Sequence, residues 1–171
     1  MNTLSRPIRS MIAGGMAAAS ALCIAASPVA AAPVDTVQTA PADGVIRLKS
    51  ANGFDETVLR LKADVQAKGI RFFDVIDQSG LGAQANLKTA RSTLIIFGNP
   101  PLGVQFLQSN PYAGLDWPVR MLVVEEGDGS VWVAWSDFAF IAKRYRISDR
   151  NAQFAMANQV AGSIAAAATA R

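Results

Sequence analysis

The fold is decided by the stretch Phe97-Gly98-Asn99-Pro100-Pro101-Leu102-Gly103, which leads on to Leu115-Asp116-Trp117-Pro118. The stretch connects two strongly apolar segments, residues 92–97 and 119–125, which we expect to be strands. Its two adjacent prolines favour the start of a short helix, because proline is tolerated in the first helical turn and its φ angle suits a helix. Residues 92–97 are apolar on both faces of a strand, so we expect them near the centre of a sheet.

Apolar periodicity assigns the rest of the chain to alternating strands and helices. Val58, Leu61 and Val65 recur on one helical stripe, and Gly69 supplies a left-handed end to that helix. We expect strands at residues 45–49, 70–77, 92–97, 119–125 and 131–135, a long helix at 55–68, a final helix capped by Ser148, and short helices at 78–87, 100–109 and 137–144. This order predicts an α+β fold of the β-α-β-β-β-β-α type. Its antiparallel sheet should carry the main helices on one face, with the short extra helices in the connections.

The N-terminal residues have the layout of a secretory signal peptide. Arg6 and Arg9 precede an uncharged Ala-, Gly- and Met-rich run, and small residues follow at 29–32. We expect cleavage after Ala31, although a cut after Ala32 also fits the small-residue rule. The alternative of an uncleaved anchor is less favoured, because an Ala-rich run holds a bilayer poorly. This predicts a signal peptide at 1–31, a flexible leader at 32–43 and a single α+β domain at 44–171. The mature protein would be periplasmic or secreted, without stable membrane insertion.

The composition excludes several kinds of chemistry. Cys23 is the only cysteine and lies within the predicted signal peptide, and the chain has no histidine. The mature domain therefore lacks a disulfide, a Cys/His zinc site, a cysteine nucleophile and a Ser-His-Asp triad. We assign no catalytic residue, metal ligand or cofactor. Without Arg6 and Arg9 the chain keeps 14 basic residues against 13 acidic ones, so no charge pattern for nucleic acid remains.

Several short motifs between residues 50 and 147 resemble the bacterial family of domains of unknown function numbered 302. The matching residues are Glu56-Thr57, Lys68-Gly69, Phe73-x-x-Ile76-Asp77, Ile96-Phe97-Gly98-Asn99-Pro100, Gly103, Asp116-x-Pro118, Asp128-Gly129-x-Val131-Trp132-Val133 and Ala142-x-Arg144-Tyr145. The resemblance implies a compact α+β unit that associates as a dimer and has no assigned biochemical role. Two positions depart from the family pattern: Gln78 stands where members often carry histidine, and Val104 stands where they often carry threonine.

Five polar residues near the central stretch are candidates for ligand binding: Asp77, Gln78, Asn99, Asp116 and Arg120. Each also has a structural interpretation. Asn99 and Asp77 sit where they could cap the helices that follow them. Asp116 could pair with Arg120 at the wall of a pocket, or it could bond backbone N–H groups in its own turn. A phosphate site at the helix start is disfavoured, because two prolines there lack N–H groups.

These observations favour an exported, non-catalytic module that forms a homodimer and binds a small molecule or an envelope protein. Trp132 and Trp135 should lie on opposite faces of one strand, as core or interface residues. The alternative is a cell-envelope enzyme that uses carboxylates, a hydrolase or an isomerase. Asp74 and Asp77 make a poor acid/base pair for it, because residues three apart on a strand point to opposite faces.

Overall fold

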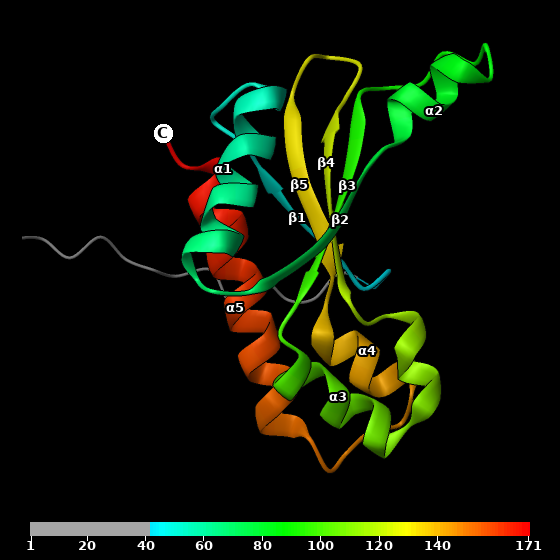
Figure 1. Ribbon diagram of the computed structural model, residues 1–171, viewed down its shortest axis with the longest axis vertical. Coiled ribbons are helices and arrows are strands. Elements are labelled where there is room, and N and C mark those ends of the chain that lie inside the picture. The colour runs from blue at the N-terminus through cyan, green and yellow to red at the C-terminus, as the bar shows by residue number, and fades with distance from the viewer. Residues whose placement is uncertain (1–41) are drawn as a thin grey trace, which may run out of the picture. The chain divides into compact units, whose positions relative to one another are not determined.

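The computed structural model describes residues 42–171, so the predicted signal peptide and most of the predicted leader lie outside the described residues. Five strands form one sheet in the order β1-β5-β4-β3-β2, and every neighbouring pair is antiparallel (Figure 1). The strands are β1 (Val45–Lys49), β2 (Arg71–Asp77), β3 (Ser92–Gly98), β4 (Val119–Glu125) and β5 (Val131–Ser136). The prediction of an α+β fold with an antiparallel sheet is confirmed.

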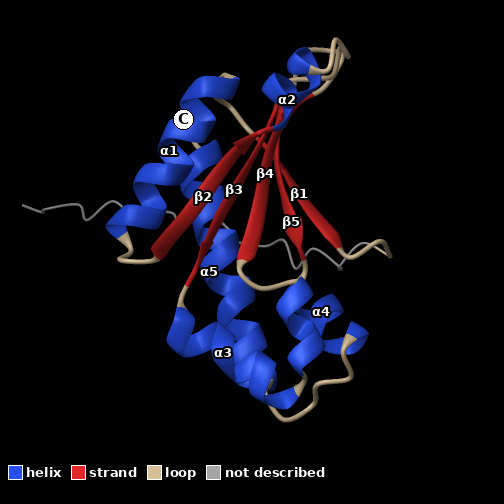
Figure 2. Cartoon of the chain, turned by 45° about the vertical axis from the view of Figure 1, so that its right-hand side comes forward, coloured by secondary structure: helices blue, strands red, loops and turns tan. Residues whose placement is uncertain are grey.

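Within this described part of the chain, five α-helices and one 3₁₀-helix, η1, occupy the connections and the C-terminal segment. They are α1 (Phe54–Ala67), α2 (Gln78–Gln84), α3 (Pro100–Ser109), η1 (Pro111–Leu115), α4 (Phe138–Arg144) and α5 (Asn151–Thr169). Figures 1 and 2 show α1 and α5 along the same side of the sheet, α2 at one end of the strands, and α3 with α4 at the other end. In residues 42–171 no helix is both long and apolar enough to cross a membrane.

The final helix starts later than the sequence pattern predicted. Its N-cap position is held by Arg150 rather than Ser148, and the first helical bond runs from the Phe154 N–H to the Arg150 carbonyl. The residues before it turn the chain out of α4: the Ile147 N–H bonds the Ala142 carbonyl, and Arg146 adopts a positive φ of 54°. The prediction of a cap at Ser148 is wrong, because that residue lies in this turn.

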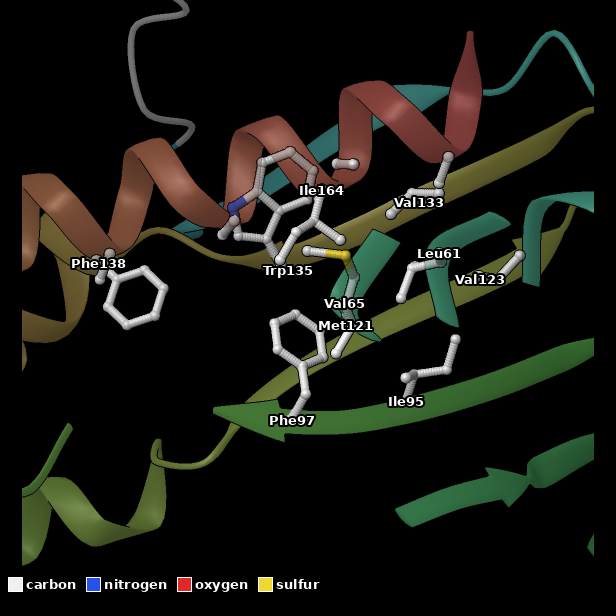
Figure 3. Packing of buried hydrophobic residues seen from close by; sticks show 14 of the residues in the cluster. Leu61, Val65, Ile95, Phe97, Met121, Val123, Val133, Trp135, Phe138 and Ile164 are labelled. Carbon is white, nitrogen blue, oxygen red and sulfur yellow. The ribbon is translucent and has the colours of Figure 1, made fainter. Parts of the chain in front are cut away.

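The hydrophobic core lies between α1, α5 and one face of the sheet. Strand residues alternate between faces, and those on this face are buried: Thr93, Ile95, Phe97, Met121, Val123, Val131, Val133 and Trp135. Leu61 and Val65 of α1 and Ile164 of α5 pack onto them with no exposed surface. Figure 3 shows these side chains pointing toward one another across the gap between the sheet and the helices. Trp132 is only partly buried and lies on the other face, as predicted.

The end of α5 is bound to the segment that links β1 to α1. The Ala51 N–H donates to the Thr169 carbonyl at 2.9 Å. The Asn52 side-chain amide donates to the carbonyls of Ala168 at 3.2 Å and Ala170 at 2.7 Å. The first and last elements of the described chain are thus held side by side.

Truncation of two neighbouring leucines on α1 should distinguish the core from the solvent side. Leu61 is fully buried and Leu59 is 60% exposed. We expect Leu61→Ala to lower the free energy of unfolding by about 2–4 kcal/mol, through lost burial and the cavity left behind. The matched change Leu59→Ala should cost less than about 0.5 kcal/mol. Urea denaturation measures both, and equal losses would contradict this packing of α1.

Candidate functional site

A buried carboxylate organises the end of the sheet where α3, η1 and α4 meet. The side chain of Asp116 is only 7% exposed. Its Oδ1 accepts a hydrogen bond from Arg120 Nη2 at 2.7 Å. Its Oδ2 accepts from the Tyr145 hydroxyl at 2.7 Å and from Arg144 Nη1 at 3.1 Å. The predicted carboxylate–guanidinium pair of Asp116 and Arg120 therefore exists, and it belongs to a larger group that we call the Asp116 cluster: Asp116, Arg120, Arg144 and Tyr145.

The Asp116 cluster connects three elements. Asp116 directly follows η1, Arg120 lies in β4, and Arg144 and Tyr145 lie at the end of α4. Arg120 Nη2 also donates to the Leu115 carbonyl at 2.7 Å, which holds the last residue of η1. A buried carboxylate is costly unless it is paired and hydrogen-bonded, and here both oxygens are satisfied. The cluster thus fixes the loop that carries Trp117 and the cis bond between Trp117 and Pro118.

Tyr145 titrates abnormally because of this environment. Partial desolvation raises the pKa of the Tyr145 phenol, and the hydrogen bond to the Asp116 carboxylate raises it further. The guanidinium carbon of Arg144 lies 5.4 Å from the Tyr145 ring centroid and opposes the shift only in part. The neutral phenol is therefore the favoured form in the folded state.

An apolar cavity lies beside the Asp116 cluster, on the helix side of the sheet. Its volume is about 40 Å³, and we call it the Trp117 cavity. Its walls come from the end of β3, from α3, from α5 and from the loop before β4: Ile70, Phe97, Gly98, Asn99, Leu102, Gly103, Phe106, Trp117, Val119, Phe138, Ala157, Val160 and Ala161. None of these side chains is charged. A water molecule needs about 10–15 Å³ in such a cavity, so the space admits a small apolar group but no large cofactor.

The shape of the Trp117 cavity depends on two glycines. A Cβ at Gly103 would stand 1.8 Å from Trp117 Nε1, and one at Gly98 would stand 3.3 Å from the same atom. The indole therefore lies directly against the backbone of α3 and of the end of β3. Phe73 meets it from β2 in an edge-on arrangement, with ring centroids 6.3 Å apart. Any side chain at Gly103 would push Trp117 out of the wall.

Asn99 is one of the residues that line the Trp117 cavity. It occupies the N-cap position of α3, as predicted, but its side chain makes no capping hydrogen bond. Its backbone carbonyl accepts from the N–H groups of Leu102 and Gly103 instead. The Asn99 side chain is exposed and has no hydrogen-bond partner among the described residues, so its amide is available to a ligand.

Asp77 and Gln78 lie at the opposite end of the sheet from the Asp116 cluster. Asp77 pairs with Thr93 near the start of β3, whereas Asp116 precedes Val119, which pairs with Phe97 near its end. Asp77 caps α2: its carboxylate accepts from the Gly80 N–H at 2.9 Å and from the Ser79 hydroxyl at 2.7 Å. These two bonds lower the pKa of Asp77 in that order of importance.

Gln78 connects α2 to β3. Its side-chain Oε1 accepts a hydrogen bond from the Ser92 hydroxyl at 2.6 Å. Of the five residues predicted for ligand binding, the structure brings Asp116 and Arg120 into direct contact. Asn99 lies in the wall of the adjoining Trp117 cavity, and Asp77 and Gln78 are separated from all three by the length of β3.

Sequence reasoning missed the apolar part of this site. Trp117, Leu102 and Val160 follow the same periodic patterns as core residues, so nothing in the pattern separates a cavity wall from a packed core. The available signal was glycine at 103, within a short helix and close in sequence to a loop tryptophan. Within residues 42–171 no group of three or more acidic, histidine or cysteine side chains is placed to hold a metal ion.

Titration of Tyr145 tests the Asp116 cluster. The chain has two tyrosines, so in a Tyr112→Phe variant the phenolate absorbance reports Tyr145 alone. We expect a midpoint above the ordinary value of 10.0, and a lower midpoint when Asp116→Asn is added. The raised pKa also links to stability. The stabilisation from Tyr145 is complete below about pH 10, the pKa of tyrosine in the unfolded chain. It is lost as the pH rises through the pKa of Tyr145 in the folded state. Equal midpoints with and without Asp116→Asn would contradict the cluster as described.

Comparison with curated proteins finds partial relatives that are named as fluoride-specific ion channels. The chain is 34% identical over 104 residues to a protein named fluoride-specific ion channel FluC 1 from Brucella suis biovar 1 (strain 1330), covering 61% of this chain and 41% of the relative. FluC 1 of Brucella abortus biovar 1 (strain 9-941) matches with the same identity over 38% of its length. The chain thus spans about two fifths of the curated relatives it matches.

Comparison with solved structures and with family models identifies the domain. The crystal structure of an uncharacterized conserved protein DUF302 from Bacillus stearothermophilus superposes with a TM-score of 0.65 at 14% identity, over 71% of this chain and 95% of that one. At this identity the likeness concerns the fold. The family model described as domain of unknown function DUF302 matches residues 46–170, which is most of the chain. The chain therefore belongs to the DUF302 family.

Proposed function

We propose that this domain is an exported, non-catalytic, homodimeric module that binds a small uncharged molecule in the Trp117 cavity. The observation that carries the proposal is an apolar cavity with a free amide at its wall. The cavity walls carry no charged side chain, and Asn99 has a donor and an acceptor to offer. Ligand sites typically combine apolar walls with a few convergent polar groups. A neutral ligand with a short apolar end and one hydroxyl or carbonyl group fits this arrangement.

The Asp116 cluster supports the cavity rather than contacting the ligand through its charges. The hollow that Asp116 and Arg120 line has a volume of only about 10 Å³ and shares Val119 and Phe138 with the Trp117 cavity. Asp116 already accepts three hydrogen bonds, so its oxygens are occupied. We assign the pair a positioning role, because it holds Trp117 against α3.

The enzyme alternative receives no comparable support. It relied on carboxylates acting together in one pocket, and Asp77 and Asp116 lie beyond opposite ends of β3. Each is engaged in capping or in an ion cluster. Channel activity is not part of the proposal either, because the channel names belong to whole proteins of which this chain matches about two fifths.

Binding of butan-1-ol, followed by amide shifts in ¹H–¹⁵N NMR spectra, tests the cavity. We expect saturable shifts at Gly98, Asn99 and Gly103 with a Kd of about 5 mM, because burial of the four carbon groups at about 0.8 kcal/mol each gives about 3.2 kcal/mol. Ala161→Leu fills the cavity and should abolish the shifts without lowering the melting temperature. The matched change Ala167→Leu, at an exposed position of α5, should leave binding intact.

Butanoate provides the second control in this experiment. Butanoate has the same number of carbon atoms as butan-1-ol, but it would bring a carboxylate to walls that carry no cation. Its Kd should therefore be at least tenfold higher than that of butan-1-ol. Equal responses to the alcohol and the acid, or unchanged butan-1-ol shifts in the Ala161→Leu protein, would contradict the proposed site.

Export is supported by the charge, apolarity and small-residue pattern of residues 1–31. We expect the full chain, expressed in a Gram-negative host, to be recovered from the periplasm with Ala32 as its new N-terminus. N-terminal sequencing of the recovered protein checks this. As a control, Arg6→Glu with Arg9→Glu removes the positive charge ahead of the apolar run, so this variant should stay in the cytoplasm unprocessed. A protein that keeps Met1 in the periplasmic fraction would argue for an uncleaved segment.

A further inference from the structure

The face of the sheet opposite α1 and α5 is apolar at its centre. Because strand residues alternate, the residues between the core positions lie on this side. We call it the open sheet face and define it by six large residues from four strands: Ile76, Leu94, Ile96, Leu122, Val124 and Trp132. All six are partly exposed. Ile76, Leu94 and Leu122 form one row across β2, β3 and β4.

Such a face differs from that of an ordinary solvated sheet. Antiparallel sheets that face water on one side usually carry polar residues there. In residues 42–171 the helices that cover the sheet, α1 and α5, pack on the core face. Contiguous exposed apolar surface of this kind marks an interaction site. The face is hollowed between its centre and the end near α4, with a volume of about 270 Å³. The hollow is lined by Val45, Leu94, Arg120, Leu122, Ala134, Trp135 and Ser136.

The size of the open sheet face suits a protein partner. Five strands spaced about 4.8 Å apart, each contributing about six residues of 3.4 Å, give about 480 Å². Two such faces in contact bury about 1,000 Å² in flat projection, near the lower bound for a specific protein pair. A small ligand would leave most of the six apolar side chains in water.

Charged residues of this face lie on both outer strands, and Arg71 of β2, opposite Gly98, is one of them. Asp74 lies on the β2 side, opposite Ile96. Arg47 and Lys49 lie on the β1 side, opposite Ala134 and Trp132. An apolar centre with a charged rim is the usual anatomy of an interface between identical chains. A second copy turned about an axis parallel to the strands would bring Asp74 of one copy toward the basic side chains of β1 in the other.

Two further charges border the face and are paired within the chain. Arg120 lies on this face near the start of β4, opposite Ile96. Its guanidinium forms an ion pair with the Asp116 carboxylate. Asp43 precedes β1 and bonds Arg47 at 2.8 Å, with both side chains about half exposed. Arg120 adjoins Ile96 and Leu122 of the face, and an axis along β4 sets it opposite its own copy, so its pairing with Asp116 is what neutralises the charge there.

The sheet edges offer a poorer route to self-association. β2 has a register shift between Phe72 and Asp74, and β1 carries two cationic side chains, and both features discourage edge-to-edge pairing. We propose that a second copy of this chain covers the open sheet face. Its two-fold axis runs along β4, so that β1 of each copy lies over β2 of the other. The inference rests on the homodimer of the proposed function and names its interface.

Sedimentation velocity of the exported protein over a range of concentrations tests the interface. We expect a dimer, and Leu122→Lys should weaken it at least tenfold by placing a charge at the apolar centre. The matched variant Leu59→Lys, at an exposed position of α1, should leave the dimer unchanged. An unchanged circular dichroism spectrum shows that Leu122→Lys is folded. If this variant does not fold, the charge exchange below decides the question.

Exchange of rim charges tests the axis with exposed residues. Arg47 lies in the cross-strand row that runs through Ala134, Leu122 and Leu94. Asp74 lies in the next row, which runs through Ile96 and Arg120. Arg47 is therefore the cation of β1 nearest in register to Asp74, one row away. Asp74→Lys should weaken the dimer severalfold, and adding Arg47→Asp should restore it, because the pair is re-formed with opposite signs.

Each outcome decides between the proposals. A protein that is monomeric at all concentrations would overturn the homodimer and this interface with it, while butan-1-ol binding would still report on the cavity. A dimer that neither Leu122→Lys nor Asp74→Lys weakens would overturn the interface alone.

Discussion

The buried carboxylate of Asp116 is the interaction on which the end of the domain beside α3 and α4 depends. Three side-chain donors from β4 and α4 converge on two oxygens that have little access to water. This arrangement offsets the free-energy cost of burying the charge, and it fixes the conformation of the loop after η1. Trp117 is the next residue, so its indole is held against Gly103 and closes one side of the cavity. A charged residue thereby produces an apolar site.

The two faces of the sheet carry the two proposed binding surfaces separately. The core face is covered by α1 and α5, and the Trp117 cavity lies at its end, where α5 residues such as Ala157 and Ala161 complete the wall. The open sheet face carries apolar residues of the same strands on the other side. A ligand in the cavity and a second copy on the open sheet face therefore occupy opposite sides of the sheet. The proposed functions do not compete for the same surface.

Much of the fold could be predicted because its signals are local. Short apolar runs bounded by turn residues located all five strands, and the stripe through Leu61 and Val65 located α1. The α5 boundary failed because Ser148 has the chemistry of a cap but lies in a turn set by the end of α4. For the candidate site, the spacing of Asp116 and Arg120 suggested their pairing as one of two interpretations. The addition of Arg144 and Tyr145 did not, because they are separated from Asp116 by 28 and 29 residues. The cavity was unpredictable for the same reason, since helices distant in sequence build its walls.

The bonds between the last turn of α5 and the segment after β1 have a consequence for the order of folding. Ala168 and Ile164 complete the layer that covers the sheet, and the carbonyls of Ala168, Thr169 and Ala170 satisfy donors at Ala51 and Asn52. A nascent chain that lacks these residues leaves uncovered the part of the core face on which α5 packs, although α1 is already present. Stable closure must therefore follow synthesis of the final helix. For the exported chain that we propose, a domain that is completed only by its last helix stays incompletely packed until synthesis ends.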